Sequence, residues 1–299
     1  MNSTTSPRRI LVAGASSGIG AALVQALAAD GHAVFACARR LDTLRAVTRD
    51  DTLARSHPCD VTDEAQVVDL IRWLREHTDR LEGLVVCAGA QGAIGPFAET
   101  NTEAWWGTLR TNLLSVYLLA KHALPLLQRG REPRIVTFSG GGSFGTFPRY
   151  SAYATAKAGV VRFTECLADE LRESGIAVNA VAPGAVATEI HRATLAAGPW
   201  RAGAEHYEWT RQMLDKGGRP MSTAVDCVRF LLSEEAVGLT GKTISANHDP
   251  WWTPMFQRRL AEITDSDLYT MRRINIVNLP DGLLKDLLLA GRALKELVS

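Results

Sequence analysis

The chain has 299 residues, 46% of them hydrophobic, and its 33 basic and 32 acidic side chains leave a net charge of +1. This near-neutral charge, without a basic stripe, argues against nucleic acid as the main partner. No apolar run is long enough to span a bilayer, and residues 1–9 lack the apolar stretch of a signal peptide. We therefore expect a cytoplasmic protein with no membrane partner.

The first predicted elements are a buried strand over residues 10–13 and a helix over residues 21–29. The glycines between them allow a tight turn and a close approach of a pyrophosphate, toward which the helix points free N–H groups and its positive dipole end. The spacing G-x-x-x-G-x-G differs from the commoner G-x-G-x-x-G, and either pattern also occurs in ordinary strand-to-helix turns. The expected dinucleotide contacts here are Gly14, Ser16, Ser17, Gly18, Ile19 and Gly20.

The second predicted strand, residues 33–38, bears on which dinucleotide is bound. It ends about twenty residues beyond the glycines, where NAD-binding domains place an acid for the ribose hydroxyls. Here Ala38 is followed by Arg39 and Arg40. Without a carboxylate to repel a 2′-phosphate, and with a guanidinium to bind it, NADP is the expected cofactor and NAD the alternative. Both arginines could instead be solvated loop residues.

After the third strand, Asp60 and Val61 are expected beside the adenine. Asp60 could equally cap the helix that begins near Asp63. Strand and helix signals then alternate along the chain. Further strands are predicted over residues 84–88, 134–139, 177–182 and 242–246, and helices over residues 65–76, 105–127 and 158–173.

This alternation predicts an α/β fold: a doubly wound parallel sheet of about seven strands, with helices on both faces. A single α/β unit of this length is common, so one domain is expected over residues 1–248, followed by a helical extension over residues 249–299. The odd number of cysteines, without paired spacing, indicates buried free thiols in a reducing compartment, and no metal site is expected. The cysteines are Cys37, Cys59, Cys87, Cys166 and Cys227.

Tyr153 and Lys157 lie one helical turn apart on one helix face. An ammonium beside a phenol favours the phenolate, so the pKa of Tyr153 is expected to fall toward the range of acid/base chemistry. The tyrosine could then exchange a proton with a substrate oxygen while a nicotinamide exchanges hydride with the adjacent carbon. The same spacing recurs at Tyr117 and Lys121, which we interpret as an ordinary helix surface. Only the neighbouring motifs distinguish the two pairs.

Together these motifs resemble the short-chain dehydrogenase/reductase family over residues 9–248, in the family's order. The resemblance implies a Rossmann-like fold and an NAD(P)-dependent enzyme that forms a homodimer or homotetramer. It also implies that Asn112 supports a water-linked proton path to the lysine, and that residues 183–188 contact the nicotinamide carboxamide. The implied catalytic residues are Tyr153, Lys157 and Asn112, and the further cofactor contacts are Ala88, Gly89, Tyr153, Lys157, Pro183, Gly184, Val186 and Thr188.

The chain departs from the family pattern at three positions. Ala13 replaces a threonine and Cys87 an asparagine, which we interpret as small apolar packing in place of a hydrogen-bonded junction. The third departure is chemical, because Gly140 stands where the family has a serine that binds the substrate oxygen, in a register set by Pro148. Losing such a donor costs about 3 kcal/mol of transition-state stabilisation.

Several groups could compensate for the missing hydroxyl. Ser139 or Ser143 could turn toward the substrate, or N–H groups of the glycine run over residues 140–142 could stabilise an oxyanion. The run could instead make room for a bulky substrate. A catalytically weak protein is the remaining alternative.

Two segments are candidates to cover the substrate. Residues 189–219 form a candidate lid with breakers at residues 198–199 and 217–218. Its ring-bearing residues are His191, Trp200, His206, Tyr207 and Trp209. The tail adds aromatic rings and arginines suited to sugars, bases and phosphates, unless these only pack or face solvent. Its residues are Trp251, Trp252, Arg258, Arg259, Arg272 and Arg273, followed by an apolar stripe of Leu283, Leu284, Leu287, Leu288 and Leu294 that would pack on the domain or a second subunit.

The expected function is an NADP(H)-dependent oxidoreductase that interconverts a secondary alcohol and a ketone. Its substrate would be a small polar molecule that carries a ring, such as a sugar or a nucleotide sugar, held in a pocket that the tail completes. A redox-neutral sugar epimerase that retains NAD(P) is the alternative, because the same residue pair could oxidise a carbinol and reduce its other face. A cofactor-binding protein with weak catalysis is the third reading.

Overall fold

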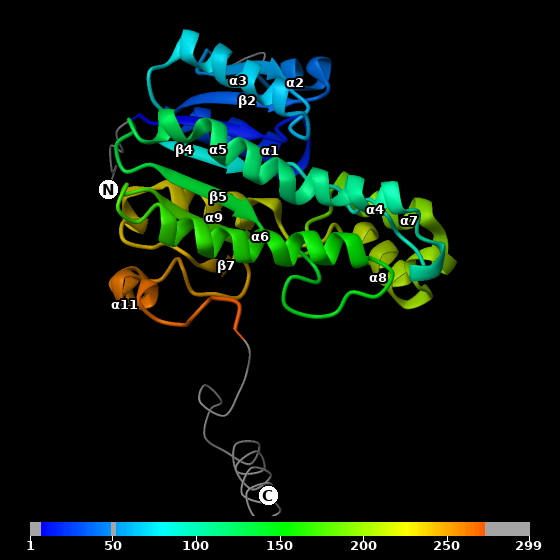
Figure 1. The fold of residues 1–299 in the computed structure, drawn as a ribbon. Coiled ribbons are helices and arrows are strands. Elements are labelled where there is room, and N and C mark those ends of the chain that lie inside the picture. The colour runs from blue at the N-terminus through cyan, green and yellow to red at the C-terminus, as the bar shows by residue number, and fades with distance from the viewer. Residues whose placement is uncertain (1–6, 49–51, 273–299) are drawn as a thin grey trace, which may run out of the picture.

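The computed structural model describes residues 7–48 and 52–272. Its centre is one parallel sheet with the strand order β3-β2-β1-β4-β5-β6-β7 (Figure 1). The strands are β1 (Arg9–Ala13), β2 (Ala33–Ala38), β3 (Ala54–Pro58), β4 (Gly83–Val86), β5 (Arg134–Phe138), β6 (Ala177–Ala182) and β7 (Thr243–Ser245). The order reverses between β1 and β4, which confirms the doubly wound sheet predicted from the alternating pattern.

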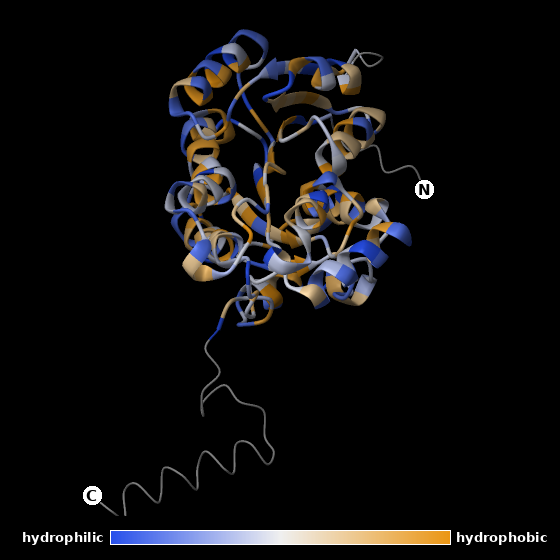
Figure 2. Cartoon of the chain, turned by 90° about the vertical axis from the view of Figure 1, so that its right-hand side faces the viewer, coloured by the Kyte–Doolittle hydropathy of each residue, from blue (hydrophilic) through white to orange (hydrophobic). Residues whose placement is uncertain are grey.

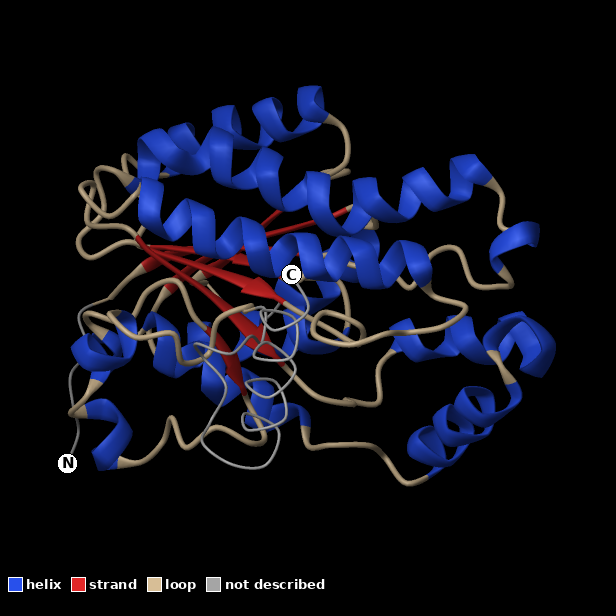
Figure 3. Cartoon of the chain, turned by 60° about the horizontal axis from the view of Figure 1, so that its bottom comes forward, coloured by secondary structure: helices blue, strands red, loops and turns tan. Residues whose placement is uncertain are grey.

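Helices cover both faces of the sheet (Figure 3). The longer ones are α1 (Gly18–Ala29), α2 (Leu41–Thr48), α3 (Glu64–His77), α4 (Thr102–Leu109), α5 (Ser115–Leu127), α6 (Ser151–Glu170), α7 (Glu189–Ala202), α8 (Ala204–Asp215) and α9 (Met221–Leu232). Shorter turns are η1 (Phe97–Glu99), η2 (Arg110–Leu114), η3 (Glu234–Ala236), α10 (Pro254–Gln257) and α11 (Leu260–Thr264). None of the described helices is long and apolar enough to cross a membrane.

Two predicted helices differ from the observed ones. The helix expected over residues 105–127 is two α-helices, α4 and α5, joined by the π-helical turn η2. The extra residue of a π-turn is typical of functional positions, and this one carries the buried Asn112. The helix expected over residues 158–173 begins earlier, at Ser151, so that Tyr153 lies in its first turn.

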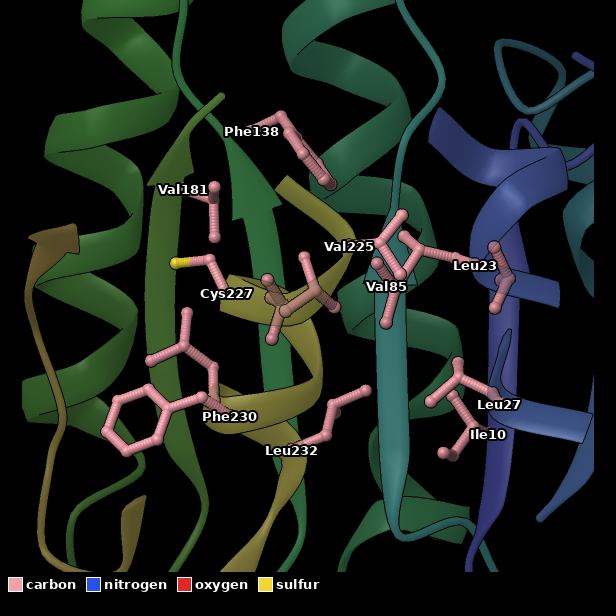
Figure 4. Close-up of a cluster of buried hydrophobic side chains, with 14 of the residues drawn as sticks. Ile10, Leu23, Leu27, Val85, Phe138, Val181, Val225, Cys227, Phe230 and Leu232 are labelled. Atoms are coloured by element: carbon pink, nitrogen blue, oxygen red, sulfur yellow. The ribbon is translucent and has the colours of Figure 1, made fainter. Parts of the chain in front are cut away.

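The core consists of two layers, because alternate residues of each strand point to opposite faces of the sheet. Ile10 and Val12 of β1 pack toward α1 and α9, while Leu11 and Ala13 pack toward α3 and α5. Figure 4 shows part of the first layer, with Leu23 beside the strands. Apolar residues gather on the inner faces of the helices, and polar residues face outward (Figure 2).

The five cysteines are all free, but they are not uniformly buried as expected. Cys37, Cys59 and Cys227 are buried, Cys87 is partly buried and Cys166 is exposed. The prediction is wrong for Cys166 because it lies on the outward face of α6, where the helical period leaves a side chain in solvent.

The described part of the tail packs against the first core layer. Trp251 and Phe256 are buried against Phe230 of α9, with ring centroids 5.6 Å and 6.4 Å away. Trp251 Nε1 also donates to Ala246 O at 3.1 Å. Arg273 and the predicted leucine stripe lie outside the described residues.

We expect Trp251→Ala to lower the free energy of unfolding by about 3–4 kcal/mol, because it empties a filled core position and leaves Ala246 O without its donor. Trp252→Ala is the matched control: this neighbouring side chain is 54% exposed against 8% for Trp251, so its loss should cost under about 1 kcal/mol. Urea unfolding of the two variants checks the difference. Equal losses of unfolding free energy in the two variants would mean that contacts other than those of Trp251 hold the tail.

Candidate active site

A cavity of about 960 Å³ opens at the carboxyl ends of the strands. Its lining includes Gly14 after β1, Cys59 after β3, Cys87 after β4 and Ser139 after β5. In open α/β sheets, ligands bind at this edge, where the strand order reverses. Every predicted cofactor contact lines this cavity, namely Gly14, Ser16, Ser17, Gly18, Ile19, Gly20, Arg39, Arg40, Asp60, Val61, Ala88, Gly89, Tyr153, Lys157, Pro183, Gly184, Val186 and Thr188.

The glycine turn has room only for hydrogen at its key positions. A Cβ on Gly14, whose φ is +80°, would lie 2.5 Å from Ala88 N, and a Cβ on Gly20 would overlap the Gly14 carbonyl. The N-cap residue of α1, Ser17, makes no side-chain cap, and the first turn carries no acidic residue. The N–H groups and positive dipole end of α1 are therefore open to an anion, and the turn fits the diphosphate of a dinucleotide.

The other end of the cavity carries the groups predicted to select the cofactor. Arg39 and Arg40 are exposed and line it next to Ala38. Asp60 accepts hydrogen bonds from the N–H and hydroxyl of Thr62 at 3.0 and 2.8 Å, whereas the side chain of Asp63 caps α3. The reading of Asp60 as the helix cap is therefore wrong, since Asp63 is one residue from the first helical position.

Tyr153 and Lys157 lie side by side on α6, both almost fully buried. Lys157 Nζ donates to the carbonyl of Phe138 at 2.9 Å and lies 5.8 Å from the centre of the Tyr153 ring. Burial raises the pKa of Tyr153 to about 12 and lowers the pKa of Lys157 to about 8. The expected lowering of the phenol pKa is thus wrong for this state, because burial outweighs an ammonium that bonds to a carbonyl.

The second pair with the same spacing is a surface feature, as interpreted. Lys121 Nζ donates to Glu64 Oε1 at 2.9 Å, and Tyr117 is 43% exposed. Neither residue lines the cavity.

Asn112 lies behind the cavity lining, in the π-turn η2. It is fully buried, donates to Ala90 O and Thr108 O at 2.8 Å, and accepts from Ala90 N at 3.2 Å. A Cβ on Gly89 would lie 3.0 Å from Asn112 Oδ1 and 3.7 Å from Lys157 Nζ, so both groups flank this glycine. Asn112 therefore holds the loop after β4 next to Lys157 but does not itself contact the cavity.

Neither serine beside Gly140 takes the place of the missing hydroxyl. Ser143 Oγ donates to Gly140 O at 2.8 Å and accepts from Gly140 N at 3.1 Å, while Ser139 Oγ donates to Val181 O at 3.4 Å. A Cβ on Gly140 would lie 2.6 Å from Tyr153 Oη, so the phenol occupies the space that a side chain would need.

The candidate lid lines part of the cavity, which we refer to as its substrate half because the lid is the segment expected to cover the substrate. It consists of α7 and α8, which lie together at the end of the sheet, with positive φ at Gly198 and Gly203 where the chain bends (Figure 1). His191, His206 and Trp209 line the cavity, and His206 stacks on Trp209 with centroids 5.4 Å apart.

The expectation that the tail completes the pocket is wrong for its described part, since nothing between Asp249 and Arg272 is among the lining residues. Its apolar residues are used in the core instead. The sequence reading missed Gln91 and Phe147 in the lining. Phe147 precedes Pro148, and Gln91 lies two residues after Gly89, but neither belongs to a motif.

The buried ammonium of Lys157 has a measurable cost. Below about pH 8 it is charged in both the folded and unfolded chain, so folding must desolvate it; between about 8 and 10.5 only the unfolded chain keeps the proton, and the contribution of Lys157 to the free energy of unfolding rises with pH. Burial also raises the pKa of the Cys87 and Cys227 thiols, which lowers stability over the same range, so the comparison with a variant isolates the lysine. We expect Lys157→Met to stabilise the cofactor-free protein by about 2 kcal/mol at neutral pH, and this gain to disappear as the pH approaches 10.5. Urea unfolding of variant and wild type across this range checks it, with the exposed Lys121→Met as control; a gain that does not change with pH would contradict it.

Comparison with known proteins gives one consistent family. Residues 8–197 match the family model for short chain dehydrogenase. The chain is 31% identical over 270 residues to the short chain dehydrogenase mpl6 of Monascus purpureus, covering 87% of this chain and 86% of that protein. It is 33% identical over 242 residues to the 3-oxoacyl-(acyl-carrier-protein) reductase FabG of Escherichia coli, covering 79% of this chain and 94% of that protein.

The fold comparison agrees with the sequence comparison. The structure of actinorhodin polyketide ketoreductase with NADPH superposes with a TM-score of 0.71 at 29% identity, over 82% of this chain and 97% of that one. The chain therefore belongs to the short-chain dehydrogenase/reductase family and is an NAD(P)-dependent oxidoreductase.

Proposed function

We propose that the protein is an NADP(H)-dependent reductase of a ring-bearing ketone with uncharged polar groups. The observation that carries this proposal is that one cavity holds both the glycine cradle and the buried pair of Tyr153 and Lys157. When bound, the nicotinamide supplies hydride to the carbonyl carbon. Ketone reduction is also the activity in the names of two relatives, the FabG reductase and the actinorhodin ketoreductase.

In this proposal Tyr153 is the proton donor. A phenol with a pKa of about 12 carries its proton at neutral pH, which suits reduction rather than oxidation. Lys157 would hold the cofactor ribose and stabilise the phenolate that forms, and Asn112 would maintain the loop and proton path beside it. The glycine turn, together with Asp60, Val61 and residues 183–188, would hold the dinucleotide.

The substrate half favours rings over phosphates. His206 lies edge-on to Phe147 and stacks on Trp209, with centroid distances of 4.9 and 5.4 Å. The lysines and arginines that line the cavity are Arg39, Arg40 and Lys157, all in its cofactor part. A nucleotide sugar would leave its diphosphate without a cation, so a sugar or another polar ring compound fits better than a nucleotide sugar.

The test is consumption of NADPH by the purified protein with a panel of ketones: cyclohexanone, α-tetralone and a ketose. Net oxidation of NADPH supports the reductase. An epimerase would instead form product without net NADPH consumption and would purify with bound cofactor, which native mass spectrometry detects. The same spectrum gives the subunit count, for which we propose a cytoplasmic homodimer or homotetramer of one-domain subunits, each with residues 249–299 as an extension.

Cofactor choice has its own test. We expect Arg39→Asp to weaken NADP binding at least about tenfold and to leave NAD binding within about threefold, since a carboxylate replaces a guanidinium at the 2′-phosphate. Binding of each cofactor by calorimetry checks this. Arg55→Asp, on β3 and outside the lining, controls for the change in net charge. Equal weakening of NADP and NAD would show that Arg39 does not read the 2′-position.

A further inference from the structure

A buried hydrogen-bond relay ends in the cavity at Gln91. Tyr150 Oη lies 2.9 Å from Thr194 Oγ1, and Thr194 Oγ1 donates to Gln91 Oε1 at 2.8 Å. Tyr150 and Thr194 are fully buried, and Gln91 is 4% exposed. The relay joins the loop after β4, the first residues before α6 and the lid helix α7. Because each buried polar group in this relay needs its hydrogen bond, the relay holds the side-chain amide of Gln91 in one position.

The relay also fixes which end of the amide faces the cavity. The Tyr150 hydroxyl is buried and has no acceptor other than Thr194 among the described residues, so it must donate to Thr194. Burial keeps this phenol protonated by raising its pKa. Thr194 then has its own proton free for Gln91 Oε1, and Gln91 presents its amino group elsewhere.

That amino group is available to a ligand. Gln91 lines the cavity, and its Nε2 has no hydrogen-bond partner within the part of the chain that the structure describes. This nitrogen is not one of the fully buried polar atoms that lack a partner, so a molecule in the cavity can reach it. Tyr150 lies one turn before Tyr153 in the same packed cluster, so the relay is anchored beside the phenol. Gly140, Ser139 and Ser143 provide no side-chain donor to the cavity.

We propose that Gln91 Nε2 is the donor that binds the substrate oxygen on which Tyr153 acts, in place of the missing serine. This rests on the proposed ketone reduction. During hydride addition to the carbonyl carbon, the oxygen gains negative charge and takes the phenol proton. A fixed N–H donor stabilises that charge without being consumed, and the relay holds it without reorganisation.

The test compares a substitution that removes the Gln91 Nε2 donor with one that removes the Thr194 hydroxyl, which holds the amide in place. Gln91→Glu keeps the acceptor for Thr194 and replaces the amino group with an oxygen; we expect kcat with NADPH and cyclohexanone or α-tetralone to fall about thirtyfold at neutral pH, with KM changed less than about threefold. Thr194→Val keeps the donor but frees the amide to turn, and should cost about fivefold. The exposed Gln128→Glu is the matched control and should match wild type.

A pH profile excludes a merely structural role. A protonated glutamic acid can donate, so Gln91→Glu should regain activity relative to wild type as the pH falls toward the pKa of that carboxyl. A loss of activity in Gln91→Glu that does not depend on pH would overturn the proposal. A loss that appears only in KM would also overturn it, because Gln91 would then bind a substrate oxygen other than the reacting one.

A second readout needs no turnover. We expect the affinity of α-tetralone for the protein saturated with NADP⁺, measured by calorimetry, to fall about threefold in Gln91→Glu, in line with the small change in KM. If this loss is seen but no ketone is reduced, the proposed function and the catalytic part of the inference fail, and only the binding of a carbonyl oxygen by Gln91 stands. If ketones are reduced equally well by Gln91→Glu and wild type, the proposed function stands and the role of Gln91 is wrong. If wild type neither binds nor reduces any of cyclohexanone, α-tetralone and the ketose, both are wrong.

Discussion

Tyr153→Phe should lower kcat for ketone reduction about 10³-fold and leave NADPH affinity within about threefold. The substitution removes one hydroxyl whose pKa, about 12, keeps it protonated at neutral pH. The structure gives that hydroxyl no hydrogen-bond partner among the described residues, so its loss should not open the fold. Stopped-flow or steady-state NADPH oxidation measures the rate, and calorimetry measures the affinity.

The chain supplies a matched control for this change. Tyr117→Phe makes the same substitution in the other tyrosine–lysine pair, where the ring is half exposed and its lysine binds Glu64. We expect wild-type rates from it. If Tyr153→Phe reduced ketones as fast as Tyr117→Phe, Tyr153 would not be the proton donor. If neither the wild type nor the variants reduced any ketone while cofactor still bound, the protein would be a cofactor-binding protein with weak catalysis.

The sheet and the cofactor half were predictable from the sequence because their signals are local. A buried strand, glycines and a helix in succession determine the turn at Gly14, Gly18 and Gly20, and alternating elements leave few topologies open. The segments that follow the strands must then meet at one edge of the sheet. All the predicted cofactor contacts consequently line one cavity.

What the sequence could not predict depends on contacts between distant residues. The relay from Thr194 to Gln91 joins positions 103 residues apart, and no spacing encodes it. The direction of the Tyr153 pKa shift depends on where Lys157 directs its ammonium, and Phe138 O accepts it. The tryptophans of the tail could bind a ligand or pack, and only the arrangement around Phe230 decides that Trp251 packs.

Restoring the serine of the family should harm this protein. We expect Gly140→Ser to lower kcat about hundredfold, although the resemblance alone would predict a gain. A Cβ there would lie 2.6 Å from Tyr153 Oη and 3.2 Å from its Cζ, so the ring must move away from the position where it meets the substrate. A displacement of about 1 Å at a reacting group costs about 10²-fold.

The control for this prediction is Gly145→Ser, in the same loop, where an added Cβ meets nothing within 4 Å. It should leave kcat unchanged, and NADPH affinity should be near wild type in both variants, which separates a displaced phenol from a damaged cradle. A gain of activity in Gly140→Ser would mean that the phenol yields to the new side chain and that the site lacks a donor. A loss of kcat in Gly140→Ser but not in Gly145→Ser would mean that the Tyr153 ring occupies the space that a side chain at position 140 would need. The glycine would then be required for the catalytic position of the phenol.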